Sequence, residues 1–218
     1  MRAFLVAVVL SILAGCAPPH YDLSEPIYLV PEESFWQGCN EDPDGYMACM
    51  AERQAVVYHG LDMWLQHFDE ATRPLVIMVW PEESVPDGAK NEPIKLAVSA
   101  HSHCKGDNWV GCYDWYEGPH PKIIFRRPDN ITSFILAHEF GHALGVIEHV
   151  KGRLSIMATP IDFYVNAEDV VLMCATNGTC PAHDEVWWEG SFYDVCRCPS
   201  SSPEDGVAKL ASGEIVCI

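Results

Sequence analysis

The chain has 218 residues, of which 49% are hydrophobic and 11% aromatic, so it is long enough and apolar enough to fold around a core. This composition excludes a largely disordered chain, which would carry few aromatic residues. The formal charge of −18 at pH 7 disfavours nucleic acids and anionic lipid head groups as partners, because the protein would repel their phosphates.

Residues 1–15 have the pattern of an export signal. Arg2 precedes an apolar run over residues 4–13, which is too short to span a bilayer as a stable helix. The run ends in Leu13-Ala14-Gly15-Cys16, which resembles the lipobox of bacterial lipoproteins. That resemblance implies cleavage before Cys16 and attachment of a diacylglycerol to its thiol; the alternative is an ordinary signal peptide in which Cys16 is incidental.

The lipobox also predicts where the protein resides. Acyl chains on Cys16 would give a stable membrane anchor. The following residue is Ala17 rather than Asp, which favours the outer membrane. We therefore expect an exported monomer that is lipid-anchored to the bacterial cell envelope.

Ten cysteines in an exported chain are expected to be largely oxidised. Lipidation of Cys16 leaves nine, so one thiol remains without an intramolecular partner. Local spacing suggests the following pairs: Cys39 with Cys49, Cys104 with Cys112, Cys174 with Cys180, and Cys217 with either Cys196 or Cys198. The sequence alone does not fix this connectivity.

The expected elements begin after a tether. Residues 16–38 are rich in Pro, Glu and Ser and are predicted to lift the domain off the membrane, so that ordered structure starts near Cys39. From residue 48 to residue 68, apolar side chains recur at helical spacing and no proline interrupts them, which predicts one long amphipathic helix.

Strand-length apolar runs follow the predicted helix. They lie at residues 75–80, 94–100 and 121–125, and a loop that holds Cys104 and Cys112 separates the last two. A second helix is expected from a cap at Asn130 or Thr132 to Gly145. A further helix over residues 167–174 and a Cys-rich extension over 176–218 complete the chain.

The second predicted helix carries the candidate chemistry. His138 and His142 are four residues apart, so both imidazoles lie on one face of the helix and can bind one ion. Glu139 lies beside them, where its carboxylate can take a proton from a metal-activated water and pass it to a leaving amine. Zinc suits these ligands, because it lowers the pKa of water and polarises a carbonyl without redox chemistry.

A longer motif surrounds these residues. The segment HEFGHALGVIEH, residues 138–149, resembles the extended zinc signature of the metzincin superfamily of metallopeptidases, and Ser155-Ile156-Met157 resembles its Met-turn. The resemblance implies that Gly145 lets the chain leave the helix and bring a third ligand to the metal, and that Met157 forms an apolar floor beneath the site. The order of elements over residues 48–175 also resembles that family.

The third ligand departs from the family spacing by one residue. The family position, three residues after the glycine, is Glu148, and His149 follows it. Neighbouring residues in an extended segment point in opposite directions, so only one of the two is expected to face the metal. We favour His149, because a one-residue extension of a loop costs little free energy; Glu148 remains the alternative.

These observations predict an α/β (α+β) domain of metzincin type over residues 39–175, with a twisted, mostly parallel sheet, an active-site helix and a Cys-rich C-terminal tail. The expected function is zinc-dependent endopeptidase activity on a polypeptide substrate, with Glu139 as the base and His138, His142 and His149 as Zn²⁺ ligands. One alternative is a zinc-binding or adhesion lipoprotein that has lost catalysis. The other is a zinc hydrolase that uses Glu148 as its third ligand.

Overall fold

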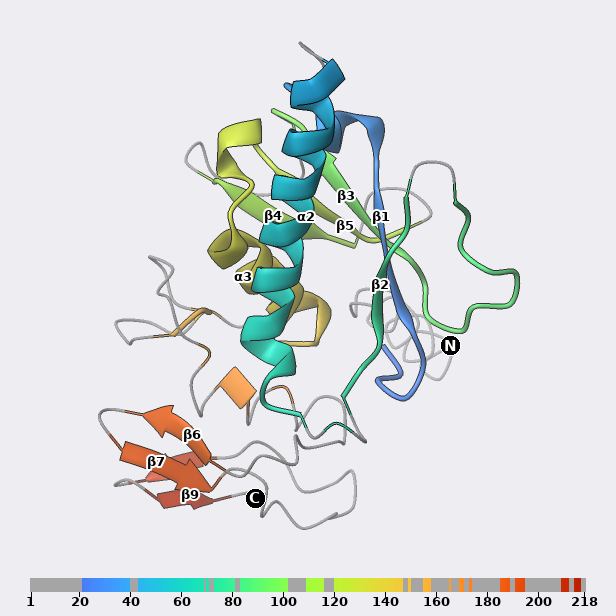
Figure 1. The fold of residues 1–218 in the computed structure, drawn as a ribbon. Helices are drawn as coiled ribbons and strands as arrows, with labels where there is room; N and C mark the ends of the chain where they lie inside the picture. Colours follow the sequence, from blue (N-terminus) through green and yellow to red (C-terminus); the bar gives the residue numbers. More distant parts are fainter. Residues whose placement is uncertain are drawn as a thin grey trace, which may run out of the picture.

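The computed structural model describes residues 21–39, 43–68, 70, 73–80, 83–101, 109–115, 120–146, 149, 155–157, 165, 169, 170 and 173, and the backbone of four strands between residues 185 and 216. The expected α/β class is confirmed: a mostly parallel five-stranded sheet packs with two α-helices. Both helices, α2 and α3, lie on the same side of the sheet (Figure 1).

The sheet has the strand order β2-β1-β3-β5-β4. Its strands are β1 (Ile27–Pro31), β2 (Val76–Met78), β3 (Ile94–Val98), β4 (Gly111–Asp114) and β5 (Lys122–Phe125). Four of them run parallel, and β4 pairs antiparallel with β5 at one edge. Their side chains are mostly buried, as expected of parallel strands that are covered by other elements.

The tether predicted for residues 16–38 is wrong from residue 21 onward, because this segment supplies the interior strand β1. Ile27 and Leu29 are fully buried, and β1 pairs with both β2 and β3. The Asn91 side chain holds the preceding residues: its Oδ1 accepts from Asp22 N at 2.9 Å and its Nδ2 donates to Asp22 O at 2.8 Å. The tether was predicted from the Pro, Glu and Ser content of the whole segment. The short apolar run over residues 27–30 within it is consistent with a strand.

The long helix is confirmed, with different ends. Helix α2 spans Pro43–Leu65, so it begins five residues before the predicted start and ends three residues before the predicted end. Proline suits the first turn of a helix, where its missing N–H costs no hydrogen bond. A disulfide between Cys39 and Cys49, one of the predicted pairs, ties α2 to the segment that follows β1 and the 3₁₀ helix η1 (Glu33–Trp36).

Helix α3 spans Ser133–Ala143 and follows the 3₁₀ helix η2 (Pro128–Asn130). Of the two predicted caps, Thr132 is used: its hydroxyl accepts a hydrogen bond from Ile135 N at 3.3 Å. The chain turns away from the helix two residues after its end, at Gly145, whose φ of 94° lies in the left-handed region that glycine adopts without strain. The predicted boundaries of this helix are therefore confirmed to within about two residues.

The predicted loop between the second and third strands contains the edge strand β4. Its four residues are too few for an alternating pattern, so only pairing with β5 reveals it. Cys112 in β4 is disulfide-bonded, and Cys104, its predicted partner, lies outside the described residues, so that pairing stays a prediction. All three predicted strands are confirmed, although the run over 75–80 is reduced to β2.

The C-terminal extension, for which no strand was predicted, contributes two antiparallel strand pairs. They pair β6 (Glu185–Trp188) with β7 (Ser191–Asp194) and β8 (Lys209–Ala211) with β9 (Glu214–Val216). The helix predicted over residues 167–174 lies largely outside the described residues, and Asp169, Val170 and Met173 within it are helical. No helix in the described part of the chain is long and apolar enough to cross a membrane.

Candidate metal centre

Two histidines project from helix α3 toward the same point. His138 and His142 are one turn apart, and their ring centroids are 4.9 Å apart. His138 is 5% exposed, whereas His142 is partly buried and His149 is exposed. The site is therefore closed on the side of His138 and open on the side of His149.

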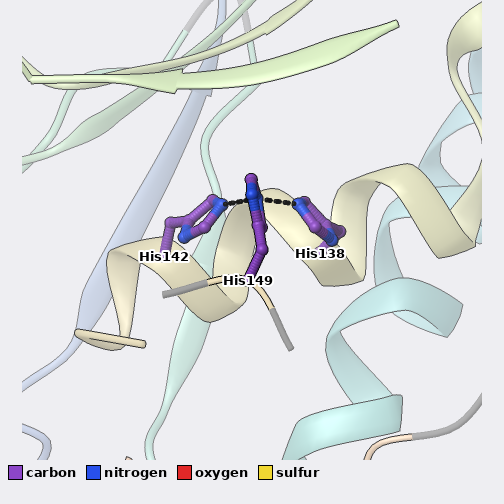
Figure 2. A group of neighbouring side chains, drawn as sticks. All are labelled: His138, His142 and His149. Carbon is purple, nitrogen blue, oxygen red and sulfur yellow. Dashed lines mark hydrogen bonds between the residues drawn. The ribbon is translucent and has the colours of Figure 1, made fainter. Parts of the chain in front are cut away.

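His149 reaches the helical pair from the segment after Gly145. Its Nε2 atom lies 3.0 Å from His138 Nε2 and 3.1 Å from His142 Nε2. Figure 2 shows its ring between the other two, with all three rings converging. The structure thus brings together the three histidines predicted from the sequence; Glu148, the alternative ligand, lies outside the described residues.

The outward nitrogen of each helical histidine is held by a backbone carbonyl. Nδ1 of His138 lies 2.7 Å from Ile156 O, and Nδ1 of His142 lies 2.6 Å from Val146 O. A carbonyl oxygen can only accept, so both Nδ1 atoms carry the proton. In the neutral rings the Nε2 atoms are then unprotonated, and their lone pairs point toward the shared centre.

The surroundings keep these imidazoles neutral. Burial lowers the pKa of His138 to about 4, with a smaller contribution from His149. Burial and the neighbouring His138 lower the pKa of His142 to about 3, and burial also lowers the pKa of His149. All three pKa values are moved below the ordinary value near 6.5, so at neutral pH the rings are in the form that binds metals.

The donor set fits a zinc ion. Ligand nitrogens about 2.0–2.1 Å from one tetrahedral ion lie roughly 3.3 Å apart. The Nε2 atom of His149 lies 3.0 and 3.1 Å from those of His138 and His142, within a few tenths of that value. All three ligand atoms lie within 4.8 Å of one another. Three neutral imidazoles leave a fourth position for a reactant, the usual composition of a catalytic zinc site.

No family model, curated protein or solved structure matches the chain. The interpretation of the site therefore depends on its own geometry and chemistry.

Glu139 is buried between α3 and the edge strand. It is 4% exposed, and a Cβ atom at Gly111 would lie 2.8 Å from its Oε1 atom. Burial raises the pKa of Glu139 to about 8, and a hydrogen bond with the Tyr113 backbone partly opposes this rise. The glycine in β4 therefore provides the room that the carboxyl group occupies.

The turn over residues 155–157 supports the helix from below. Ile156 supplies the carbonyl that holds His138, and Met157 is fully buried, with its Sδ 2.5 Å from where a Cβ of Gly141 would stand. The Ser155 hydroxyl donates to Asp169 Oδ1 at 2.7 Å and accepts from Met157 N at 2.9 Å. The turn is thus fixed both to its own backbone and to a buried carboxylate.

The sequence did not identify several residues that shape this site. Gly111 and Tyr113 lie in a strand that the sequence did not predict, and Trp64 was recognised only as an apolar position of the long helix. Asp169, on the segment after the turn, is fully buried. Its position directly before the apolar run over residues 170–173 was a weak signal, because Glu168 stands next to it and charged residues are mostly exposed.

Proposed function

We propose that this protein is a zinc-dependent endopeptidase of metzincin type. The single observation that carries the proposal is the convergence of three imidazole Nε2 atoms, two of them with their tautomer fixed by backbone carbonyls. The arrangement of the elements supports it: the long helix α2 and a mostly parallel sheet with the antiparallel edge strand β4 accompany α3, the helix that carries His138 and His142.

His138, His142 and His149 would hold the metal. A bound zinc ion would lower the pKa of a coordinated water toward neutrality and polarise the scissile carbonyl. Glu139 would take the proton from the attacking water and pass it to the leaving amine. The support for this role is the position of the carboxyl group, which follows His138 in the chain and is buried against Gly111 of β4.

The edge strand offers a place for an extended substrate. Arg126 N donates to Val110 O, and Cys112 pairs with Ile124, so alternate residues of this strand face β5. The backbone groups of Gly111 and Tyr113 consequently face away from β5, and within the described residues no other strand pairs with β4. The Tyr113 backbone already hydrogen-bonds Glu139, so a peptide that adds here as a further strand would pair through the remaining outward groups, such as those of Gly111.

The test uses the full-length protein purified in detergent and a fluorescently labelled, denatured protein as substrate. We expect about one zinc per chain and cleavage that a chelator abolishes and zinc restores. Glu139→Gln should keep the metal and lose cleavage, because this residue is proposed as a base and not as a ligand. Zinc binding without any cleavage by the wild type would favour a zinc-binding lipoprotein over a peptidase.

A further inference from the structure

Helix α2 crosses α3 at very close range. A Cβ atom at Gly60 would lie 2.6 Å from Ser133 O and 2.9 Å from Leu136 Cδ2, so only glycine allows the two helices to approach to this distance. The contact lies on the turn of α3 that precedes His138. One turn further along α2 lies Trp64, which is fully buried.

Trp64 touches α3 at two points. Its indole Nε1 donates a 2.8 Å hydrogen bond to Ala137 O. Its ring lies against Gly141, where an added Cβ would be 2.5 Å from Cζ2 of the indole. Met157 Sδ lies at the same 2.5 Å from that Cβ position, so Gly141 is enclosed between the indole and the thioether.

These two points are adjacent in sequence to the two helical histidines. Ala137 precedes His138 and Gly141 precedes His142, and the four-residue spacing places both contacts on one face of α3. Consecutive residues on a helix differ by about 100° in direction. The rigid indole holds the face of α3 that carries Ala137 and Gly141. It therefore also fixes the directions in which the two imidazoles project.

We propose that Trp64 is a positioning residue of the metal centre, which sets the rotation of α3 about its axis so that His138 and His142 meet His149. This inference rests on the metal centre proposed above, not on the peptidase activity. The hydrogen bond to Ala137 O sets the position of α3 along its axis, and the contact at Gly141 sets its rotation about that axis. His149 comes from a separate segment, so a rotated helix would separate the three nitrogens.

The test compares zinc affinity, measured by competition with a chromophoric chelator, with the free energy of unfolding of the metal-free protein. Trp64→Phe removes the N–H donor and the distal ring, and we expect zinc affinity to fall roughly tenfold or more, as when a group that orients a ligand is lost. The visible absorption spectrum of the Co²⁺ form should change as well, because it reports ligand geometry directly.

The matched control is Phe35→Leu. Phe35 is also a fully buried aromatic, and its ring packs on Trp36, Phe125 and the Arg53 guanidinium. It should lower stability and leave zinc affinity within about twofold of the wild type. If Trp64→Phe also lowers stability but leaves zinc affinity and the Co²⁺ spectrum unchanged, Trp64 is only a core residue and the inference is overturned.

A second variant covers failure of Trp64→Phe to fold. Gly141→Ala keeps Trp64 and forces a methyl group against it, so zinc affinity should fall and the Co²⁺ spectrum should shift; an unaltered affinity and spectrum would overturn the inference. If the wild type binds zinc but cleaves no protein, the proposed peptidase activity is refuted. The zinc affinities of these variants and of Phe35→Leu would still test the positioning role of Trp64. A wild type that binds no zinc would refute both.

Discussion

The Nε2 atoms of His138 and His149 lie 3.0 Å apart, although the two residues belong to different segments. We therefore expect His149→Ala to open a metal position and to weaken zinc affinity strongly, whereas Glu148→Ala should have a mild effect of at most about 10 to 100-fold. Equilibrium dialysis against a competing chelator measures both. The reverse ranking would indicate a site with two histidines and one carboxylate.

Gly111 should be needed for catalysis and not for metal binding. A methyl group there would lie 2.8 Å from Glu139 Oε1 and 2.4 Å from Ile135 Cγ2, so it would displace the proposed base. We expect Gly111→Ala to lower kcat by about 100-fold, the cost of displacing a reacting group by about 1 Å, at unchanged zinc content. The neighbouring, exposed Val110→Ala is the control. Equal kcat values for the two variants would show that catalysis by Glu139 does not require the room left by Gly111.

Ser155→Ala should loosen the turn beneath the site. It removes a hydrogen bond to Asp169 and one from Met157 N, both buried, and should lower the free energy of unfolding by about 1–3 kcal/mol. Chemical denaturation of the metal-free protein measures this loss. Ser99→Ala, which removes hydrogen bonds at an exposed loop, should cost much less. Similar losses for both variants would argue against a special role of the Ser155–Asp169 pair.

Glu139 should make the stability of the metal-free protein depend on pH. Its pKa is raised from 4.5 to about 8 in the fold, so the unfolded chain loses the proton first as pH rises. Relative to Glu139→Gln, the wild type should lose free energy of unfolding between about pH 4.5 and pH 8, by up to about 1.4 kcal/mol per pH unit. Denaturation in the presence of chelator over this range measures the difference. A difference that stays constant, or grows in favour of the wild type, would contradict the buried carboxyl.

Cys16 is expected to carry the membrane anchor. Cys16→Ser should abolish incorporation of labelled palmitate and move the protein from the membrane fraction to the soluble fraction, because the acyl chains provide the membrane affinity. Cys39→Ser, at the Cys39–Cys49 disulfide, is the control and should leave labelling unchanged. Labelling that persists in Cys16→Ser would refute lipidation at this residue.

The sequence by itself determined the local geometry of the site. The spacing of His138 and His142 sets both imidazoles on one face of α3, and Thr132 and Gly145 define where that helix begins and ends. These features depend on contacts within about four residues, so the 3.6-residue period is sufficient to predict them. The long helix and the three apolar strands were predicted for the same reason.

Tertiary structure alone decided the rest. The apolar run of β1 is compatible with a strand, but only its pairing with β2 and β3 makes it an interior strand of the sheet. β4 is recognised only through its pairing with β5. The choice of His149 depends on the path of the chain after Gly145, and the roles assigned to Gly111 and Trp64 depend on atoms that belong to distant segments. Close packing between such segments involves side-chain shape across the whole chain, and a local pattern of polar and apolar residues does not encode it.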